Sequence, residues 1–137
     1  MRPVLDAEAV VALLEREHDA RARVVWHLAA ARRLRKEVGV AAVTLAELYR
    51  GVGRTRSLDA FLNREGELLH VRDTDRALAR LVGAVLHEAA RGSEDLVDAH
   101  AVALTVEAGG GTILTGDPHD LERLSAPYPT VTVVALS

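Results

Sequence analysis

Four carboxylate side chains lie where apolar segments of the sequence give way to helical ones. They are Asp6, Glu47, Asp98 and Asp117. In a parallel α/β sheet the carboxyl ends of the strands share one edge, and ligands bind there. Acids that are distant in the sequence can therefore meet in one pocket, and oxygen ligands of this kind favour Mg²⁺ or Mn²⁺. The chemistry expected of such a pocket is metal-assisted hydrolysis of a phosphodiester.

Three of these acids also have a purely structural explanation. The spacing from Thr44 to Glu47 matches a capping box, in which the glutamate bonds back to the first backbone N–H of a helix. Asp117 precedes Pro118, as an N-cap residue often precedes a proline at the first helical position. Asp6 could cap the first helix. Taken singly, these three positions do not decide between a structural and a functional role.

Asp98 is different, because its expected helical face is apolar. At 100° per residue it shares that face with Ala101, Val102 and Thr105, and His100 is predicted to mark the opposite side. A buried charge is costly unless it is paired or bound to a metal. Two carboxylates about 4 Å apart repel by roughly 4 kcal/mol at an effective dielectric near 20. A cluster of four acids is therefore expected only where a cation binds or some acids stay protonated.

The elements that must position these acids alternate along the chain. Short apolar runs predict strands at residues 3–5, 38–43, 68–71, 112–115 and 131–136. Helices are predicted between them, with caps at Asp19, Thr44 and Ser93, and one short helix at 58–63. Strands that alternate with helices predict an α/β fold with a five-stranded parallel sheet between two helical layers. The chain is expected to form one domain over residues 1–137.

Composition narrows the function classes. The sequence has no cysteine, which excludes disulfides, Fe–S clusters and thiolate zinc sites and fits a cytoplasmic protein. No apolar run approaches the roughly 20 residues of a membrane span, and the start of the chain reaches an acid too soon for a signal peptide. Residues 16–56 are mainly basic, and residues 57–137 are mainly acidic. This asymmetry suits a polyanion held beside an acidic pocket, or simply solvated helix faces.

Other catalytic classes fit the sequence less well. The histidines lack the spacing of a metal-binding helix, and the sequence contains neither a phosphate-binding loop nor a nucleophile elbow. A haloacid-dehalogenase-like phosphatase would need a second aspartate where Glu8 lies and a downstream lysine, whereas Lys36 is the single lysine. A non-catalytic acidic α/β domain that binds a protein partner is the remaining alternative.

Four segments in their order and spacing resemble the PIN-domain ribonucleases, most of all the VapC-type toxins of bacterial toxin–antitoxin pairs. These segments are Val4–Ala7, Thr44–Gly51, Asp98–Leu104 and Ile113–Leu121. The resemblance implies an α/β/α fold and a Mg²⁺- or Mn²⁺-dependent endonuclease that cuts RNA. It also implies a homodimer that a small antitoxin inhibits.

The resemblance carries the family's acidic set onto Asp6, Glu47, Asp98 and Asp117. From metal chemistry we expect Asp6 and Asp98 to hold the principal metal, directly or through water, and Glu47 and Asp117 to complete the shell or hold a second ion. Asp120 could join or replace Asp117, because the family often has a second acid three residues later. Two further residues have expected roles: Thr115 helps to hold the site, and Arg50 contacts a phosphate unless it only forms a surface salt bridge.

Overall fold

Five strands form one parallel sheet, in the order β3-β2-β1-β4-β5. The computed structural model of the chain describes residues 2–137. The strands are β1 (Pro3–Leu5), β2 (Val38–Ala41), β3 (Leu69–Arg72), β4 (Gly111–Thr115) and β5 (Val131–Ala135). The five-stranded parallel sheet predicted from the sequence is therefore confirmed.

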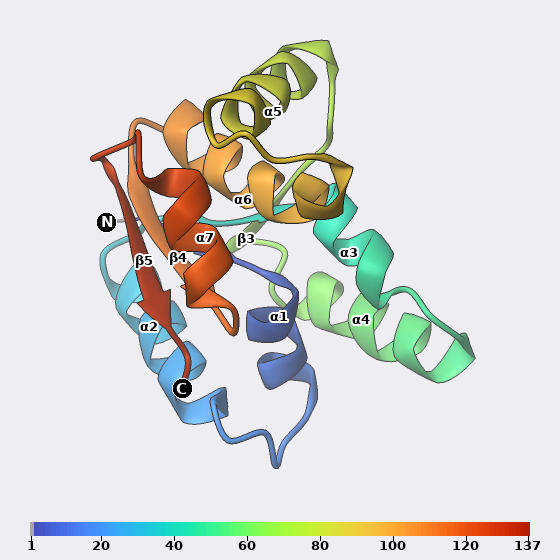
Figure 1. Cartoon of the computed structure of the whole chain (residues 1–137). Helices are drawn as coiled ribbons and strands as arrows, with labels where there is room; N and C mark the ends of the chain where they lie inside the picture. Colours follow the sequence, from blue (N-terminus) through green and yellow to red (C-terminus); the bar gives the residue numbers. More distant parts are fainter. Residues whose placement is uncertain (1) are drawn as a thin grey trace.

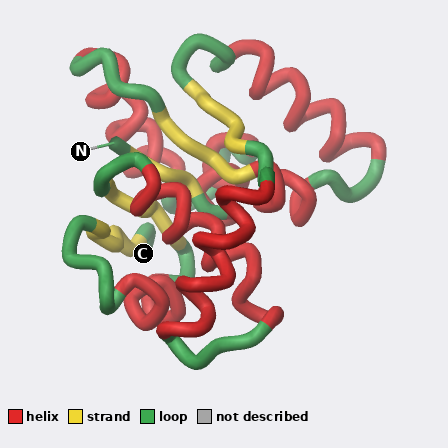
Figure 2. The backbone as a smooth tube through the Cα atoms, turned by 90° about the horizontal axis from the view of Figure 1, so that it is seen from above, coloured by secondary structure: helices red, strands yellow, loops and turns green. Residues whose placement is uncertain are grey.

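Helices cover both faces of this sheet, which gives three layers (Figures 1 and 2). One layer contains α1 (Ala7–Leu14), α2 (Arg21–Arg33), α3 (Ala42–Leu48) and α4 (Val52–Arg64). The other contains α5 (Arg76–Glu88), α6 (Leu96–Glu107) and α7 (Pro118–Ser125), and a 3₁₀ turn (Ser93–Asp95) precedes α6. Because successive side chains of a strand point to opposite faces, Leu5 belongs to the first core and Val4 to the second.

Strand β2 shows why the sheet must be covered on both sides. All four of its residues are buried, as expected for a strand between two helical layers. Gly39 lets α6 pack closely against the strand, because a Cβ atom there would lie 3.2 Å from Leu104 Cδ2. The close contact between β2 and α6 is one of the packings that fix the position of Asp98 on α6.

The strand order places a topological switch between β1 and β4. β1 pairs with β2 on one side and with β4 on the other, with Val4 opposite both Gly39 and Ile113. The chain leaves β1 towards β2 and β3, and it returns through α6 to β4. Ligands of parallel α/β sheets bind at the carboxyl ends of strands at such a point. Asp6 directly follows β1, and Asp117 follows β4 after one intervening residue, Gly116.

Several predicted boundaries were wrong. The strand predicted at 38–43 ends at Ala41, which is the N-cap of α3, so Thr44 lies inside the helix and no capping box forms with Glu47. Pairing explains this early end, because Ala41 opposite Arg72 is the last pair between β2 and β3. The helix predicted at 58–63 begins at Val52 instead, after Gly51 turns the chain with φ +84°.

Two predicted caps were also wrong. The N-cap of α2 is Ala20 rather than Asp19, and its backbone N–H donates to His18 Nδ1 at 3.1 Å. Ser93 opens the 3₁₀ turn, and α6 begins only at Leu96. Within residues 2–137, the helices are all too short or too polar to cross a membrane.

Candidate active site

The four acids singled out in the sequence line one hollow at the carboxyl edge of the sheet. This hollow has a volume of about 1000 Å³, and its walls include Asp6, Glu47, Asp98 and Asp117. They come from the end of β1, from α3, from the first turn of α6 and from the β4–α7 turn. The fold thus brings the four distant positions to one place, while their roles as metal ligands stay a prediction.

Asp6 is the most firmly held of the four. It is 8% exposed, and its Oδ1 accepts the Ala9 N–H at 2.9 Å as the N-cap of α1. Its Oδ2 accepts the N–H of Gly116 at 3.1 Å, so the side chain joins β1 to the β4–α7 turn. Burial raises the pKa of Asp6, while hydrogen bonds from Thr115, Ala9 and Gly116 oppose that rise. The expected capping role of Asp6 is confirmed, and it coexists with a position in the hollow.

Asp98 is the acid of the site whose pKa is raised most. Its pKa is raised from 3.8 to about 7, first by burial and then by the charges of neighbouring carboxylates. Those neighbours are Asp6, Asp117, Asp120 and Asp95, in order of decreasing effect. A carboxyl group in this environment is close to half-protonated at neutral pH when no cation is bound. The expectation that Asp98 is no ordinary surface charge therefore has a physical basis.

A tight trio of carboxylates includes Asp98 but not the other three predicted acids. Oxygen atoms of Asp95, Asp98 and Asp120 all lie within 4.8 Å of one another. Asp120 is the alternative that the sequence left open, whereas Asp95 was missed. A signal for Asp95 was present, because an acid three residues before Asp98 lies on the same side of a helix. Asp95 is 5% exposed, and its carboxylate pairs with Arg91.

Glu47 and Asp117 are the more exposed members of the predicted set. Asp117 occupies the N-cap position of α7 without the side-chain hydrogen bond expected of a cap. Its carboxylate lines the hollow instead, and its backbone N–H donates to Thr115 Oγ1 at 2.8 Å. Thr115 is fully buried and also bonds to Asp6, so its hydroxyl connects two of the predicted site residues.

A close backbone approach shapes the wall beside Asp6. A Cβ atom on Gly116 would lie 2.5 Å from Glu8 Cγ, so only glycine fits there without displacing Glu8. Glu8 Oε1 in turn lies 2.5 Å from His18 Nε2. The His18 Nδ1 accepts a backbone N–H, so Nε2 carries the proton and donates to Glu8. This pair ties the loop between α1 and α2 to the edge of the hollow.

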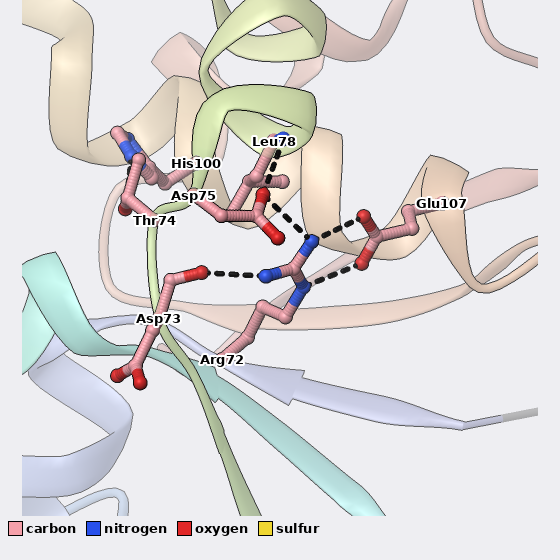
Figure 3. Close-up of polar contacts among 7 residues, drawn as sticks. All are labelled: Arg72, Asp73, Thr74, Asp75, Leu78, His100 and Glu107. Atoms are coloured by element: carbon pink, nitrogen blue, oxygen red, sulfur yellow. Dashed lines mark hydrogen bonds and ion pairs between the residues drawn. The ribbon is translucent and has the colours of Figure 1, made fainter.

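Helix α6, which carries Asp98, is fixed by contacts with the end of β3 and with the loop between β3 and α5 (Figure 3). The Arg72 guanidinium donates to both oxygens of Glu107 at 2.9 and 2.8 Å, and to Asp75 at 3.3 Å. His100 bonds to the Leu96 carbonyl through Nδ1 at 2.8 Å and to the Thr74 hydroxyl through Nε2 at 2.9 Å.

The position predicted for His100, on the exposed side of α6, was wrong. The residue is 4% exposed, and its two hydrogen bonds explain why a polar ring is tolerated there. The error arose because the helix is covered on more than one side, so that one apolar face does not define its environment. His100 holds the first turn of α6, in which Asp98 lies.

The donor set of the site fits a hard divalent cation. Among residues 2–137, the trio of Asp95, Asp98 and Asp120 is the group in which three possible ligand atoms lie within 4.8 Å of one another. The groups that would hold an ion are carboxylates, and oxygen ligands of this type favour Mg²⁺ or Mn²⁺ over zinc. The raised pKa of Asp98 reflects crowded negative charge, which a cation would relieve.

Comparisons with known proteins bear on the family and the fold of the chain. The profile of the PIN domain family matches residues 4–126. Among solved structures, the chain is similar to VapBC2 from Rickettsia felis bound to a DNA fragment from their promoter, with a TM-score of 0.65 and 19% identity over 98% of each chain. No curated protein sequence matches the chain at a significant level. The structural likeness supports the fold, and the profile covers the segments that contain all the acids described above.

Proposed function

This chain belongs to the PIN domain family, and from that premise we propose that it is a metal-dependent endoribonuclease that hydrolyses RNA phosphodiester bonds. The observation that supports this most is the convergence of carboxylates from distant segments around Asp98. Charge of one sign is costly to gather in this way, and a nuclease that binds divalent ions has a use for it.

The residues proposed to hold the ion are Asp6, Glu47, Asp98 and Asp117, with Asp120 beside them. When bound, Mg²⁺ or Mn²⁺ would supply a Lewis acid that acidifies water and neutralises charge on the phosphate. Asp6 provides a fixed carboxylate, because two backbone N–H groups orient its oxygens. Glu47 and Asp117 are exposed enough to adjust to an incoming ligand.

Within this proposal, binding of the ion would be coupled to the loss of a proton from Asp98. A group with a pKa of about 7 can hold or release a proton near neutral pH at little cost. A cation in the site would favour the ionised form, so that Asp98 would give up its proton when the ion binds. The hydrogen bonds of His100 hold the first turn of α6, and so keep the Asp98 carboxylate at the hollow.

We also propose that the protein is the toxin of a type II toxin–antitoxin pair and acts as a homodimer. The likeness of fold to VapBC2 supports the antitoxin partner, and the homodimer follows from the resemblance to VapC-type toxins. The partner proposed is a small antitoxin that places an arginine or lysine in the acidic hollow, because the crowded carboxylates favour a cation there. An antitoxin variant without basic residues that still inhibits at this site would count against that mode of inhibition.

The test of the nuclease proposal is cleavage of total RNA by the purified protein with Mg²⁺, Mn²⁺ or a chelator, followed by mapping of the cut ends. Discrete cleavage is expected with the metals and none with the chelator. Asp98→Asn and Asp6→Asn should abolish it, whereas Asp73→Asn should not, because Asp73 is an exposed acid outside the hollow. Full cleavage by Asp98→Asn in Mg²⁺ would refute the proposed nuclease function.

A further inference from the structure

The acidic hollow poses an electrostatic problem for the substrate proposed above. Among residues 2–137, those that line it include seven acids but neither an arginine nor a lysine. Single-stranded RNA carries a negative charge at every phosphate, so a divalent ion at the cut phosphate leaves its neighbours repelled. The binding of RNA therefore needs at least one fixed cation close to the edge of the hollow.

Arg91 is a cation fixed at that edge. Its Nε atom donates to the carboxylate of Asp95, the buried acid whose oxygen lies within 4.8 Å of oxygens of Asp98 and Asp120. One carboxylate thus separates the guanidinium from Asp98. The Arg91 side chain is 27% exposed, so one part of it is held by the protein and another part meets solvent.

The backbone of Arg91 is held as firmly as its side chain. Helix α5 ends at Glu88, and Ala90 adopts a left-handed conformation with φ +54°. The Ala90 N–H donates to the His87 carbonyl at 3.1 Å, and the Arg91 N–H donates to the Leu86 carbonyl at 2.9 Å. This is a helix-ending motif of the Schellman type, and it directs the chain at Arg91 towards the acids. A non-glycine residue in this conformation costs some stability.

The free part of the guanidinium is suited to a phosphate. Within residues 2–137, Asp95 is the side-chain partner of Arg91, and its bond uses only Nε. The two terminal nitrogens keep their N–H groups, and these form a planar fork that matches two oxygens of a phosphate. Asp95 behind the guanidinium orients this fork, as a buried carboxylate commonly orients an arginine at a binding site.

We propose that Arg91 binds the RNA phosphate next to the one that is cut, and that Asp95 is the residue that positions it. This inference rests on the proposed ribonuclease function. It assigns to Asp95 a role as the anchor of Arg91 in place of a role as a metal ligand. Arg91 then offsets the repulsion between the RNA phosphates and the acids of the hollow. Asp98 lies on the opposite side of Asp95 from Arg91 and faces the hollow.

The experiment measures the affinity of a fluorescently labelled single-stranded RNA oligonucleotide by anisotropy over a range of salt concentrations, with Ca²⁺ in place of Mg²⁺. Arg91→Ala should weaken binding by roughly 10-fold, and the salt dependence should fall by about 0.7 in log–log slope, as for one lost phosphate contact. Arg80→Ala is the matched control, because Arg80 is an exposed arginine of α5, the helix that precedes Arg91, and forms no ion pair within residues 2–137. The control should bind like the wild type.

Arg91→Lys guards against a folding defect, because it keeps the positive charge but loses the planar fork. A folded Arg91→Lys protein should bind several-fold more weakly than the wild type. Wild-type affinity and salt slope in either folded variant would overturn the assignment of Arg91. Cleavage of the same oligonucleotide in Mg²⁺ separates the two proposals. If the wild-type protein binds RNA through Arg91 but does not cut it, the proposed nuclease activity is refuted and the assignment of Arg91 stands.

Discussion

Replacing Asp98 by asparagine should stabilise the metal-free protein at alkaline pH. The folded state holds the pKa of Asp98 at about 7, against an ordinary value of 3.8. Between these values the folded protein binds a proton that the unfolded chain does not, so stability falls as the pH rises from about 4 to about 7. Asparagine is neutral at every pH and has nearly the same shape, so the Asp98→Asn protein escapes this loss.

The size of the effect follows from the two pKa values. Their difference corresponds to roughly 4 kcal/mol of unfavourable free energy for the ionised group. We reduce this to about 2 kcal/mol, because the side chain is only half-buried and solvent screens its neighbours. For a chain of this length, about 2 kcal/mol corresponds to a rise in Tm of roughly 7 °C.

The assay is urea denaturation of both proteins in a chelator at pH 4 and at pH 8. The two should have equal stability at pH 4, where Asp98 is protonated in the folded state. At pH 8 the Asp98→Asn protein should be more stable by about 2 kcal/mol. Asp73→Asn is the control, and it should follow the wild type at both values. If Asp98→Asn were less stable than the wild type at pH 8, the reasoning on crowded carboxylates would be refuted.

Three further predictions concern the same site. Gly116→Ala should lower the free energy of unfolding by about 1–3 kcal/mol, because its Cβ would meet Glu8; an unchanged urea midpoint would contradict the close approach. Mn²⁺ at about 100 times its Kd should stabilise the wild type by about 2.7 kcal/mol and leave Asp98→Asn unaffected, which thermal melts can measure. Asp117→Asn and Asp120→Asn should each lower the pKa of Asp98, because each removes a charge that raises it. Carbon-detected NMR titration of Asp98 checks this. An unchanged pKa of Asp98 in both variants would contradict the contribution of Asp117 and Asp120 to its rise.

The sheet and its edge could be predicted because their signals are local. Continuous apolar runs identify buried parallel strands, and the rule that ligands bind at carboxyl ends applies whatever the strand order. Asp6 and Asp117 were therefore found from their places just beyond the ends of strands. The strand order, which makes β1 and β4 neighbours, depends on pairing between distant segments and could not be read from either one.

The errors have a common physical cause. The start of α3 depends on where the pairing of β2 with β3 stops, and the start of α2 on the hydrogen bond from the Ala20 N–H to His18. Thr44 and Asp19 therefore had the residue types of caps without the positions. The surroundings of His100 and Asp95 depend on contacts with the β3–α5 loop and with Arg91, which come from other segments. A periodicity argument assigns one buried face to a helix, whereas α6 is buried over most of its surface.

Binding of a divalent ion tests the central claim most directly. Isothermal titration with Mn²⁺ should give saturable binding to the wild-type protein and to Asp73→Asn, with release of protons near pH 7 as Asp98 ionises. The same titration should give no binding to Asp98→Asn. Equal Mn²⁺ affinity in the wild type and in Asp98→Asn, or no binding to either protein, would contradict the account.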